Sequence, residues 1–577
     1  MGSELGVTAE SKEVATLTPV AIWWACWGCV WTLFVALGVA YLIKHRDSPT
    51  VRIRGLGLAL SAIFFLHIYF WSVQWGVMIG TLMPGDAMYW IMGTWLPIGI
   101  SLFYAANGRF LHIAKLQKKY AYPCSRLSVQ PGTKRKGGLT GRFQHLDYST
   151  KSLVVVGVAM FIQILLTIVM YLISRRFHST WGIPGTEVHG TPMEVKSAQG
   201  KGWEWWPGVL SQVFWCWIVA PYILWKARDI NDTQGWRTQT IACAIAGLPA
   251  TPLWLCGTYV DAMASMSAVW LPPQWFCLAI MIMEIFTIFL PCWEVMHRQS
   301  LRQETLDAIA QWEARNRTGG EAKSIGSGPT VVESILSGWK STKGSVRSDA
   351  SNESILTMGA LEYVLDRNPA PLQEFSALCE FSGENIAFLT AVAEWKSSLP
   401  VALKDKTAPR DEKIQELMRE PFNHALHLYA EYISPSHAEF PVNLGFQVLK
   451  KPEQIFEKPT AILYGEREVP EPATPFRETF NIDSPVTPFT GDSDKGLKDS
   501  VNEIKDLVQY WGEIPAEFDA SVFDEAESSI KYLVLTNTWP KFIRNHRASI
   551  GSSDSSTILE AGENVVRLPD ERSTKST

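Results

Sequence analysis

Seven long apolar runs in the first half of the chain constrain its fold more than any other feature. Each is long enough to cross the hydrocarbon core of a bilayer, about 30 Å thick, as a helix of roughly 20 residues. Backbone polar groups find no water inside a bilayer, so such runs form helices there. The sequence predicts a transmembrane bundle over 19–293 after a short tail, 1–18. Its spans are 19–43, 56–79, 88–111, 152–173, 207–225, 238–259 and 272–293.

Basic residues in the connecting loops predict the orientation of this bundle. The loops after the first, third and fifth runs carry most of the Lys and Arg residues of the first half. The N-terminal tail and the other loops carry few, namely Lys12, Arg175, Arg176, Lys196 and Lys201. Loops rich in Lys and Arg stay on the cytoplasmic side. We therefore expect a multi-pass plasma-membrane protein with its N-terminus outside and its C-terminus in the cytoplasm.

Two ionisable residues lie near the middle of predicted spans, where a charge is costly. Glu284 lies in the seventh run and His67 in the second. One interpretation is an intramembrane sensor for a ligand or a proton. The other is structural: Glu284 is protonated or bonded to a polar partner such as Gln74 or Gln163, and His67 is a satisfied interior histidine.

The second half of the chain is polar and predicts a helical cytoplasmic domain, which makes the expected fold class all-α. Residues 294–353 combine a helical extension with a flexible linker rich in Gly, Ser, Thr and Lys. Apolar stripes at helical spacing follow over 354–547, and the Ser/Thr-rich tail 548–577 is expected to be disordered. This half is acidic, which argues against a nucleic-acid partner, because nucleic-acid binding needs a positive surface.

Three short strings inside 354–547 are more specific than the stripes. Residues 380–388 read Glu-Phe-Ser-Gly-Glu-Asn-Ile-Ala-Phe. Residues 428–434 read Leu-Tyr-Ala-Glu-Tyr-Ile-Ser and are followed by Val-Asn-Leu at 442–444. The third string, Phe-Asp-Glu-Ala at 523–526, precedes Phe542 and Ile543. In order, these strings resemble three signature blocks of the RGS family, the regulators of G-protein signalling. Placed behind seven membrane helices, they make the whole chain resemble the seven-transmembrane RGS proteins of fungi and plants.

The resemblance implies a domain that accelerates GTP hydrolysis by a heterotrimeric Gα subunit and so switches the signal off. Such a domain is not itself an enzyme; it holds the Gα switch segments in their transition-state shape. By motif position, Glu384 and Asn385 match the family's first contact loop. Asn443 matches the asparagine that reaches toward the Gα glutamine, and Leu533 matches an apolar contact beside it.

Two positions depart from the family pattern at the last long helix. Asn537 stands where the family commonly has an aspartate, and Lys541 where it has an arginine. An amide accepts a hydrogen bond without charge assistance, and a lysine lacks the bidentate guanidinium fork. We therefore expect a weakened or re-tuned affinity for Gα.

An insertion over about 450–515 separates the second signature block from the third. It is proline-rich and charged, which predicts a disordered surface excursion. Three of its residues precede proline and are predicted sites of proline-directed phosphorylation: Thr474, Ser484 and Thr487.

The chain carries no nucleotide-binding loop, dinucleotide fingerprint or metalloprotease motif. We therefore expect no cofactor, no metal site and no catalytic site of its own. The expected partners are a Gα subunit, the lipid bilayer and an extracellular small molecule. The alternative is a receptor-like sensor or a transporter whose RGS-like domain docks Gα without accelerating hydrolysis.

Overall fold

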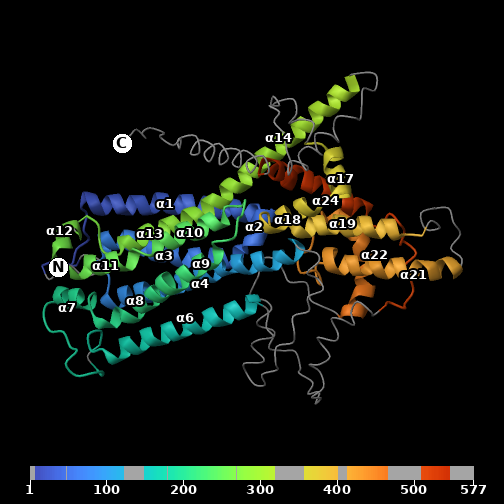
Figure 1. The fold of residues 1–577 in the computed structure, drawn as a ribbon. Coiled ribbons are helices and arrows are strands. Elements are labelled where there is room, and N and C mark those ends of the chain that lie inside the picture. Colours follow the sequence, from blue (N-terminus) through green and yellow to red (C-terminus); the bar gives the residue numbers. More distant parts are fainter. Residues whose placement is uncertain are drawn as a thin grey trace, which may run out of the picture. The chain divides into compact units, whose positions relative to one another are not determined.

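A computed structural model describes residues 7–121, 148–318, 356–400, 412–465 and 509–545, apart from positions 9, 47, 179 and 268. These residues are mostly helical (Figure 1), which confirms the predicted helical class for them. They contain no β-strand, only an isolated parallel bridge between Ser174 and Ile183. The described part of the chain divides into two compact units: the residues up to His297 belong to the first, and the described residues within 298–465 and 510–545 belong to the second.

The first unit is a bundle of long helices joined by short helical turns. Its helices are α1 (Pro19–Lys44), α2 (Pro49–Arg54), α3 (Leu56–Ile79), α4 (Gly85–Ala121), α6 (Tyr148–Ile173), α7 (Pro192–Gln199), η2 (Trp203–Trp205), α8 (Trp206–Val213), η3 (Phe214–Val219), α9 (Ala220–Ala227), α10 (Trp236–Gly247), α11 (Ala250–Tyr259), η4 (Asp261–Met263), α12 (Ala264–Ser267), α13 (Gln274–Glu284), η5 (Ile285–Phe289) and α14 (Leu290–Thr318). Within this unit α7 and α12 lie at one end and α2 at the other (Figure 1).

Six helices in the described part of the chain are long and apolar enough to cross a membrane. They indicate a multi-pass membrane protein. Their bounds are Pro19–Lys44, Leu56–Ile79, Lys151–Ile173, Pro192–Ala227, Trp236–Tyr259 and Gln274–Ser300.

The third predicted span falls in α4, which is not among these six. α4 is a continuous helix of 37 residues that packs against α3, α6 and α8. It buries polar side chains such as Asn107 and Gln117. A Cβ on Gly99 would lie 2.7 Å from Cγ of Leu66, so α3 and α4 approach closely at this glycine. A helix that faces mainly other helices has less need of apolar side chains than one that faces lipid, which explains its lower hydropathy.

Two of the spanning segments contain a π-helical turn. η3 and η5 each end two residues before a proline, Pro221 and Pro291 respectively. Proline has no N–H to donate to the carbonyl four residues earlier. A π-helical turn is one way in which a helix accommodates such an interruption. η5 begins directly after Glu284, so the interruption lies beside the predicted intramembrane site.

The second unit is a separate helical bundle. Its elements are the end of α14, then α17 (Met358–Arg367), α18 (Ala370–Leu378), α19 (Gly383–Ser398), α21 (Glu412–Leu428), η6 (Tyr429–Ile433), α22 (Phe446–Tyr464), α24 (Asp524–Leu533), η8 (Val534–Thr538) and the helical residues 539–545. Trp395, Phe422, Phe456 and Phe523 are fully buried at its centre. Nε1 of Trp395 donates to the Pro421 carbonyl at 2.9 Å, which satisfies the one polar group of this indole.

The predicted bounds of the insertion, about 450–515, are too wide at both ends, because they include residues that pack in the second unit. α22 runs to Tyr464 and buries Phe456. At the other end, the backbone N–H of Tyr510 donates to Oδ1 of Asn423 at 2.6 Å. Pro452 and Pro459, which lie within the predicted proline-rich insertion, are both buried within α22, so packing overrides their low helix propensity. The three phosphorylation candidates, most of the predicted linker and the tail lie outside the described residues.

Candidate functional site

Glu284 and His67, the two predicted intramembrane residues, contact each other. Nδ1 of His67 lies 2.7 Å from Oε1 of Glu284, and Glu284 is fully buried. Nε1 of Trp31 donates to Oε2 of Glu284 at 2.5 Å, and Nε2 of His67 lies 2.9 Å from Oγ1 of Thr32. We call these four residues the Glu284 cluster. It joins α1, α3 and α13.

The hydrogen bonds of the Glu284 cluster fix how many protons it holds. The Thr32 hydroxyl donates to the Gly28 carbonyl at 2.7 Å, so it accepts from Nε2 of His67. The single remaining proton lies between Nδ1 of His67 and Glu284. Either Glu284 is protonated beside a neutral imidazole, or a carboxylate faces an imidazolium. The cluster is neutral in both cases, which lowers the cost of burying it.

The predicted amide partners of Glu284 bond elsewhere. Gln74 exchanges hydrogen bonds with Gln274 at 3.0 and 3.2 Å. Gln163 bonds Thr167 one turn along its own helix. Both amides are therefore engaged away from the acid, which instead takes the imidazole that faces it.

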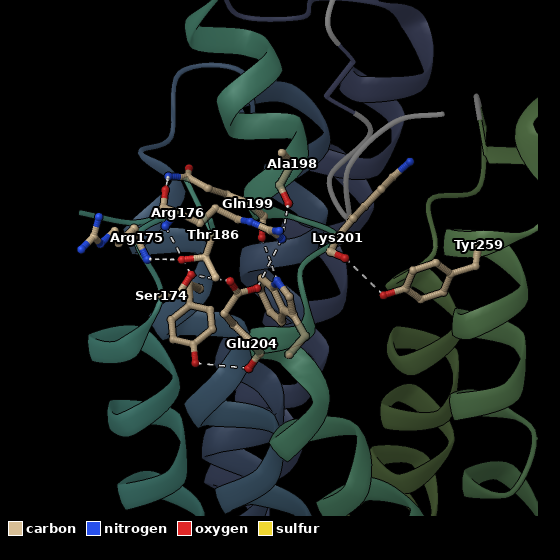
Figure 2. Close-up of polar contacts among 11 residues, drawn as sticks. Ser174, Arg175, Arg176, Thr186, Ala198, Gln199, Lys201, Glu204 and Tyr259 are labelled. Atoms are coloured by element: carbon tan, nitrogen blue, oxygen red, sulfur yellow. Dashed lines mark hydrogen bonds and ion pairs between the residues drawn. The ribbon is translucent and has the colours of Figure 1, made fainter. Parts of the chain in front are cut away.

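A second buried acid, Glu204, was not singled out in the sequence. Its carboxylate accepts from Oγ of Ser174 at 2.5 Å and lies 3.3 Å from Nη1 of Arg176 (Figure 2). Nε2 of Gln199 donates to the Arg176 carbonyl at 2.8 Å. We call Glu204, Ser174, Arg176 and Gln199 the Glu204 cluster; it ties the end of α6 to the α7–α8 connection. One local feature could have predicted this buried acid: it lies among three tryptophans within residues 203–206. Tryptophans beside an apolar run are also typical of a membrane-interface belt, so the feature is not specific.

The first predicted Gα-contact loop lies at the start of α19. Glu384 is half-buried in the first turn of α19, and Asn385 is 6% exposed. Oδ1 of Asn385 is buried and has no hydrogen-bond partner among the described residues. Phe381, just before the helix, has φ of 51°, a conformation that is uncommon for a bulky residue. A strained turn and an unsatisfied buried acceptor thus occur within the same signature string.

Asn443 lies in an exposed loop between η6 and α22. The backbone N–H of Val442 donates to the Tyr432 carbonyl at 2.8 Å and holds the loop against η6. The Tyr432 ring lies 6.1 Å from that of Phe388 on α19. This chain of contacts ties the Asn443 loop to the helix that begins with Glu384.

Leu533 directly precedes a π-helical turn in the last predicted contact helix, and Asn537 lies within that turn. Both side chains are half-buried, while Val534 and Leu535 between them are buried. α24 packs against α19, so two of the predicted contact elements are neighbours. The π-helical turn η8 includes Asn537.

Lys541 lies in a buried ion pair. Its Nζ contacts both carboxylate oxygens of Glu380, at 3.0 and 2.9 Å, and only 10% of the side chain is exposed. Arg298, in the same unit, lies 3.8 Å from Glu380. Glu380 is the first residue of the signature string 380–388, so Lys541 links the last helix to the loop that carries Glu384.

A second charge network stabilises α24. Lys396 contacts Asp524 at 2.5 Å and Glu527 at 2.6 Å, and Lys531 contacts Glu527 at 2.9 Å. Burial acts to raise the pKa of Glu527, but hydrogen bonds from the two lysines outweigh it and leave this pKa lowered. Partial burial acts to lower the pKa of Lys396, yet its bonds to the two carboxylates leave this pKa raised. The ionised network is thus favoured in the folded unit.

No group of three or more His, Cys, Asp or Glu side chains that could hold a metal ion occurs within the described ranges. Comparison of the chain with protein-family models, with curated proteins and with solved structures finds no match.

Proposed function

We propose that this protein is a plasma-membrane, seven-helix negative regulator of G-protein signalling whose second unit accelerates GTP hydrolysis by a Gα subunit. The proposal starts from the three signature strings. One observation carries it further: these strings, far apart in the sequence, fold into one helical unit in which most of their hydrophobic residues are buried while Asn443 stays exposed. Exposure of a polar residue in a loop fixed by its buried neighbours is what a contact residue requires.

The surface around Asn443 is proposed to stabilise the transition state of GTP hydrolysis by Gα. A Gα subunit already carries its own arginine and a water-orienting glutamine. Asn443 can donate and accept hydrogen bonds without adding charge.

The Lys541–Glu380 ion pair changes what we expect of Lys541, one of the two residues of the last helix that differ from the family pattern. Lys541 is engaged by Glu380 and would act by positioning the segment that carries Glu384. We retain the expectation of a re-tuned Gα affinity, because Asn537 brings no negative charge to the surface.

In the membrane half, we propose α4 as the seventh crossing, with the α7 end outside. Five basic residues on the predicted outer side count against this orientation, and three of them contact other groups at the α7 end of the bundle. Arg175 pairs with Glu187 at 2.6 Å and Arg176 lies 3.3 Å from Glu204. Nζ of Lys196 donates to the Thr81 carbonyl at 2.6 Å. The proposed orientation rests on the Lys and Arg count of the loops, which these contacts leave unchanged. Anchoring in the bilayer would raise the effective concentration of the second unit beside a lipid-anchored Gα.

Single-turnover GTP hydrolysis by a Gα subunit tests this function. The full-length protein in nanodiscs should accelerate hydrolysis and should bind the aluminium fluoride complex of Gα–GDP more tightly than the GTP-analogue or GDP forms. Binding without acceleration would favour the docking alternative, and a preference for the GDP form would contradict the proposal.

A further inference from the structure

Arg109 on α4 is a cation whose counter-charge is missing from the described part of the chain. The residue is half-buried, and its Nε is fully buried without a hydrogen-bond partner. Within the described ranges, no carboxylate interacts with the guanidinium, and no oxygen accepts a hydrogen bond from it. Removing a charge from water without pairing it is costly. The guanidinium therefore calls for an acceptor that these residues do not supply.

The nearby Arg54 shows how the same end of the bundle satisfies another arginine. Its Nη1 donates to Oε1 of Gln239 at 2.6 Å, and its Nη2 donates to the Gln234 carbonyl at 2.5 Å. Its Cζ lies 5.9 Å from the centre of the Trp236 ring. Both terminal nitrogens of Arg54 thus have acceptors within the protein, and those of Arg109 have none among the described residues.

The guanidinium of Arg109 lies at the edge of the membrane. A Cβ built on Gly55 would lie 2.8 Å from Nη1 and 3.0 Å from Cζ of Arg109, so the group packs against the turn between α2 and α3. Gly55 directly precedes the membrane-spanning segment Leu56–Ile79. This segment has 24 residues. Such a helix is about 36 Å long, more than the roughly 30 Å of the hydrocarbon core. Its first residues therefore lie at the depth of the lipid headgroups.

The charged end of Arg109 can be reached from outside the bundle. Of its three nitrogens only Nε is buried, so Nη1 and Nη2 keep accessible surface. These two nitrogens form a planar fork that donates two parallel hydrogen bonds to a phosphate group. A phosphate is also the anion that every phospholipid places at this depth.

The chain around Arg109 adds positive charge instead of neutralising it. Arg52 on α2 is exposed. The segment 122–147, which follows α4 in the sequence, contains five Lys or Arg residues and one acid, Asp147. Basic residues beside a bilayer attract anionic lipids. A phosphatidylcholine headgroup carries its own cation beside the phosphate, so an anionic lipid gains more from pairing with Arg109.

We propose that Arg109 binds the headgroup phosphate of an anionic phospholipid in the leaflet at the α2 end of the bundle. Nη1 and Nη2 would donate to two phosphate oxygens while the acyl chains stay in the bilayer. A lipid is favoured over an acidic segment of a protein partner, because headgroups are always present at this depth. This inference does not rest on the proposed action on Gα.

Thermal unfolding of the full-length protein in two kinds of nanodisc tests the proposal. One contains phosphatidylcholine and the other phosphatidylglycerol with the same acyl chains. In phosphatidylcholine, Arg109→Gln should unfold at the same temperature as the wild type or higher, because it removes an unpaired charge. In phosphatidylglycerol, it should unfold at a lower temperature than the wild type. An equal effect in both lipids would assign Arg109 a structural role, or hydration by water alone, and would overturn the proposal.

Native mass spectrometry of the full-length protein measures the lipid preference directly. The first phosphatidylglycerol should bind the wild type about tenfold more tightly than the first phosphatidylcholine, because hydrogen bonds between charged groups are worth at least about that factor. Arg109→Gln should abolish this preference, and Arg109→Lys should keep part of it, because lysine lacks the fork. Lys118→Gln removes an exposed charge from the same helix and should keep the preference.

Two results of these measurements would overturn the proposal. One is a preference for phosphatidylglycerol that survives in Arg109→Gln or is lost equally in Lys118→Gln. The other comes from inorganic phosphate added to the phosphatidylcholine nanodiscs: if it stabilises the wild type as much as phosphatidylglycerol does, the site takes the free anion and the lipid assignment is wrong. The Gα hydrolysis assay is independent of all these outcomes.

Discussion

Nδ1 of His67 lies 2.7 Å from Oε1 of Glu284, across 217 residues of sequence and between two different helices of the membrane half. Trp31 and Thr32 of α1 complete the surroundings of this pair. Because the Thr32 hydroxyl donates to a carbonyl, one proton is left for the imidazole and the carboxyl to share. A proton that moves between these two groups makes both neutral or both charged, and the net charge of the cluster is zero in either arrangement.

Substitutions of Glu284 test whether the fold requires an ionised carboxylate at this position or only a proton shared with His67. Glu284→Gln should be nearly neutral for stability, because the amide oxygen can accept from Trp31 while the amide N–H donates to Nδ1 of His67. Glu284→Ala leaves both partners unsatisfied and should cost about 3–5 kcal/mol, the usual effect of breaking a buried pair. Thermal unfolding of the full-length protein in nanodiscs measures both. If Gln is as damaging as Ala, the carboxylate must be ionised and the shared-proton description is wrong.

Asn443→Ala should reduce the acceleration of Gα GTP hydrolysis at least tenfold, since one hydrogen bond made in the transition state contributes about that factor. It should change the stability of the second unit by less than about 0.5 kcal/mol, because the side chain is exposed. Asn443→Asp tests whether the contact must be uncharged. Glu416→Ala, an exposed position on α21, serves as the control and should keep full activity. Full activity of Asn443→Ala would remove this residue from the contact surface.

Lys541→Ala should destabilise the second unit by about 3–5 kcal/mol, because it leaves Glu380 buried without its nearest cation. Lys541→Arg keeps the charge and should restore most of that stability. Hydrogen exchange of peptides from 356–545, measured on the full-length protein, reports this change. A direct Gα contact would instead show as lost hydrolysis acceleration with unchanged exchange protection, and that result would contradict the positioning role.

The Lys396–Glu527–Lys531 network predicts an acid-sensitive second unit. The pKa of Glu527 is lowered from 4.5 in the folded state, so the unfolded state binds a proton more readily. Stability from this group is present above about pH 4.5 and is lost as the pH falls through the folded pKa. Hydrogen exchange corrected for intrinsic rates should show α24 losing protection over that range. Glu527→Gln should be less stable at neutral pH and should show a smaller pH dependence; an unchanged dependence would assign the acid sensitivity to other carboxylates.

Local properties of the sequence were enough to predict the helical class and most of the membrane segments. Six of the seven predicted runs fall in helices that are long and apolar enough to span a bilayer. Among the apolar stripes predicted over 354–547, one contains Phe422, Leu426 and Tyr429, and all three are buried. Hydropathy over about 20 residues and a 3.6-residue period are carried by the segment itself, so they need no knowledge of neighbours.

Two local signals misled. The proline-rich, charged composition of 450–515 predicted a surface excursion, but packing around Phe456 keeps α22 helical through Pro452 and Pro459. The tryptophans on both sides of Glu204 suggested a membrane-interface belt rather than a buried acid. Its contacts with Ser174 and Arg176 are what make Glu204 part of a buried polar cluster. In each case the deciding contact comes from a distant segment.

The sequence by itself determined that residues such as Glu284, His67, Asn443 and Lys541 needed an explanation, because a charge in an apolar run or a polar residue in a signature string is visible locally. Only the tertiary structure decided their partners: Glu284 takes His67 rather than Gln74 or Gln163, and Lys541 takes Glu380. The physical reason is that hydrogen bonds and ion pairs form where helix faces meet, and one-dimensional spacing does not specify which faces those are.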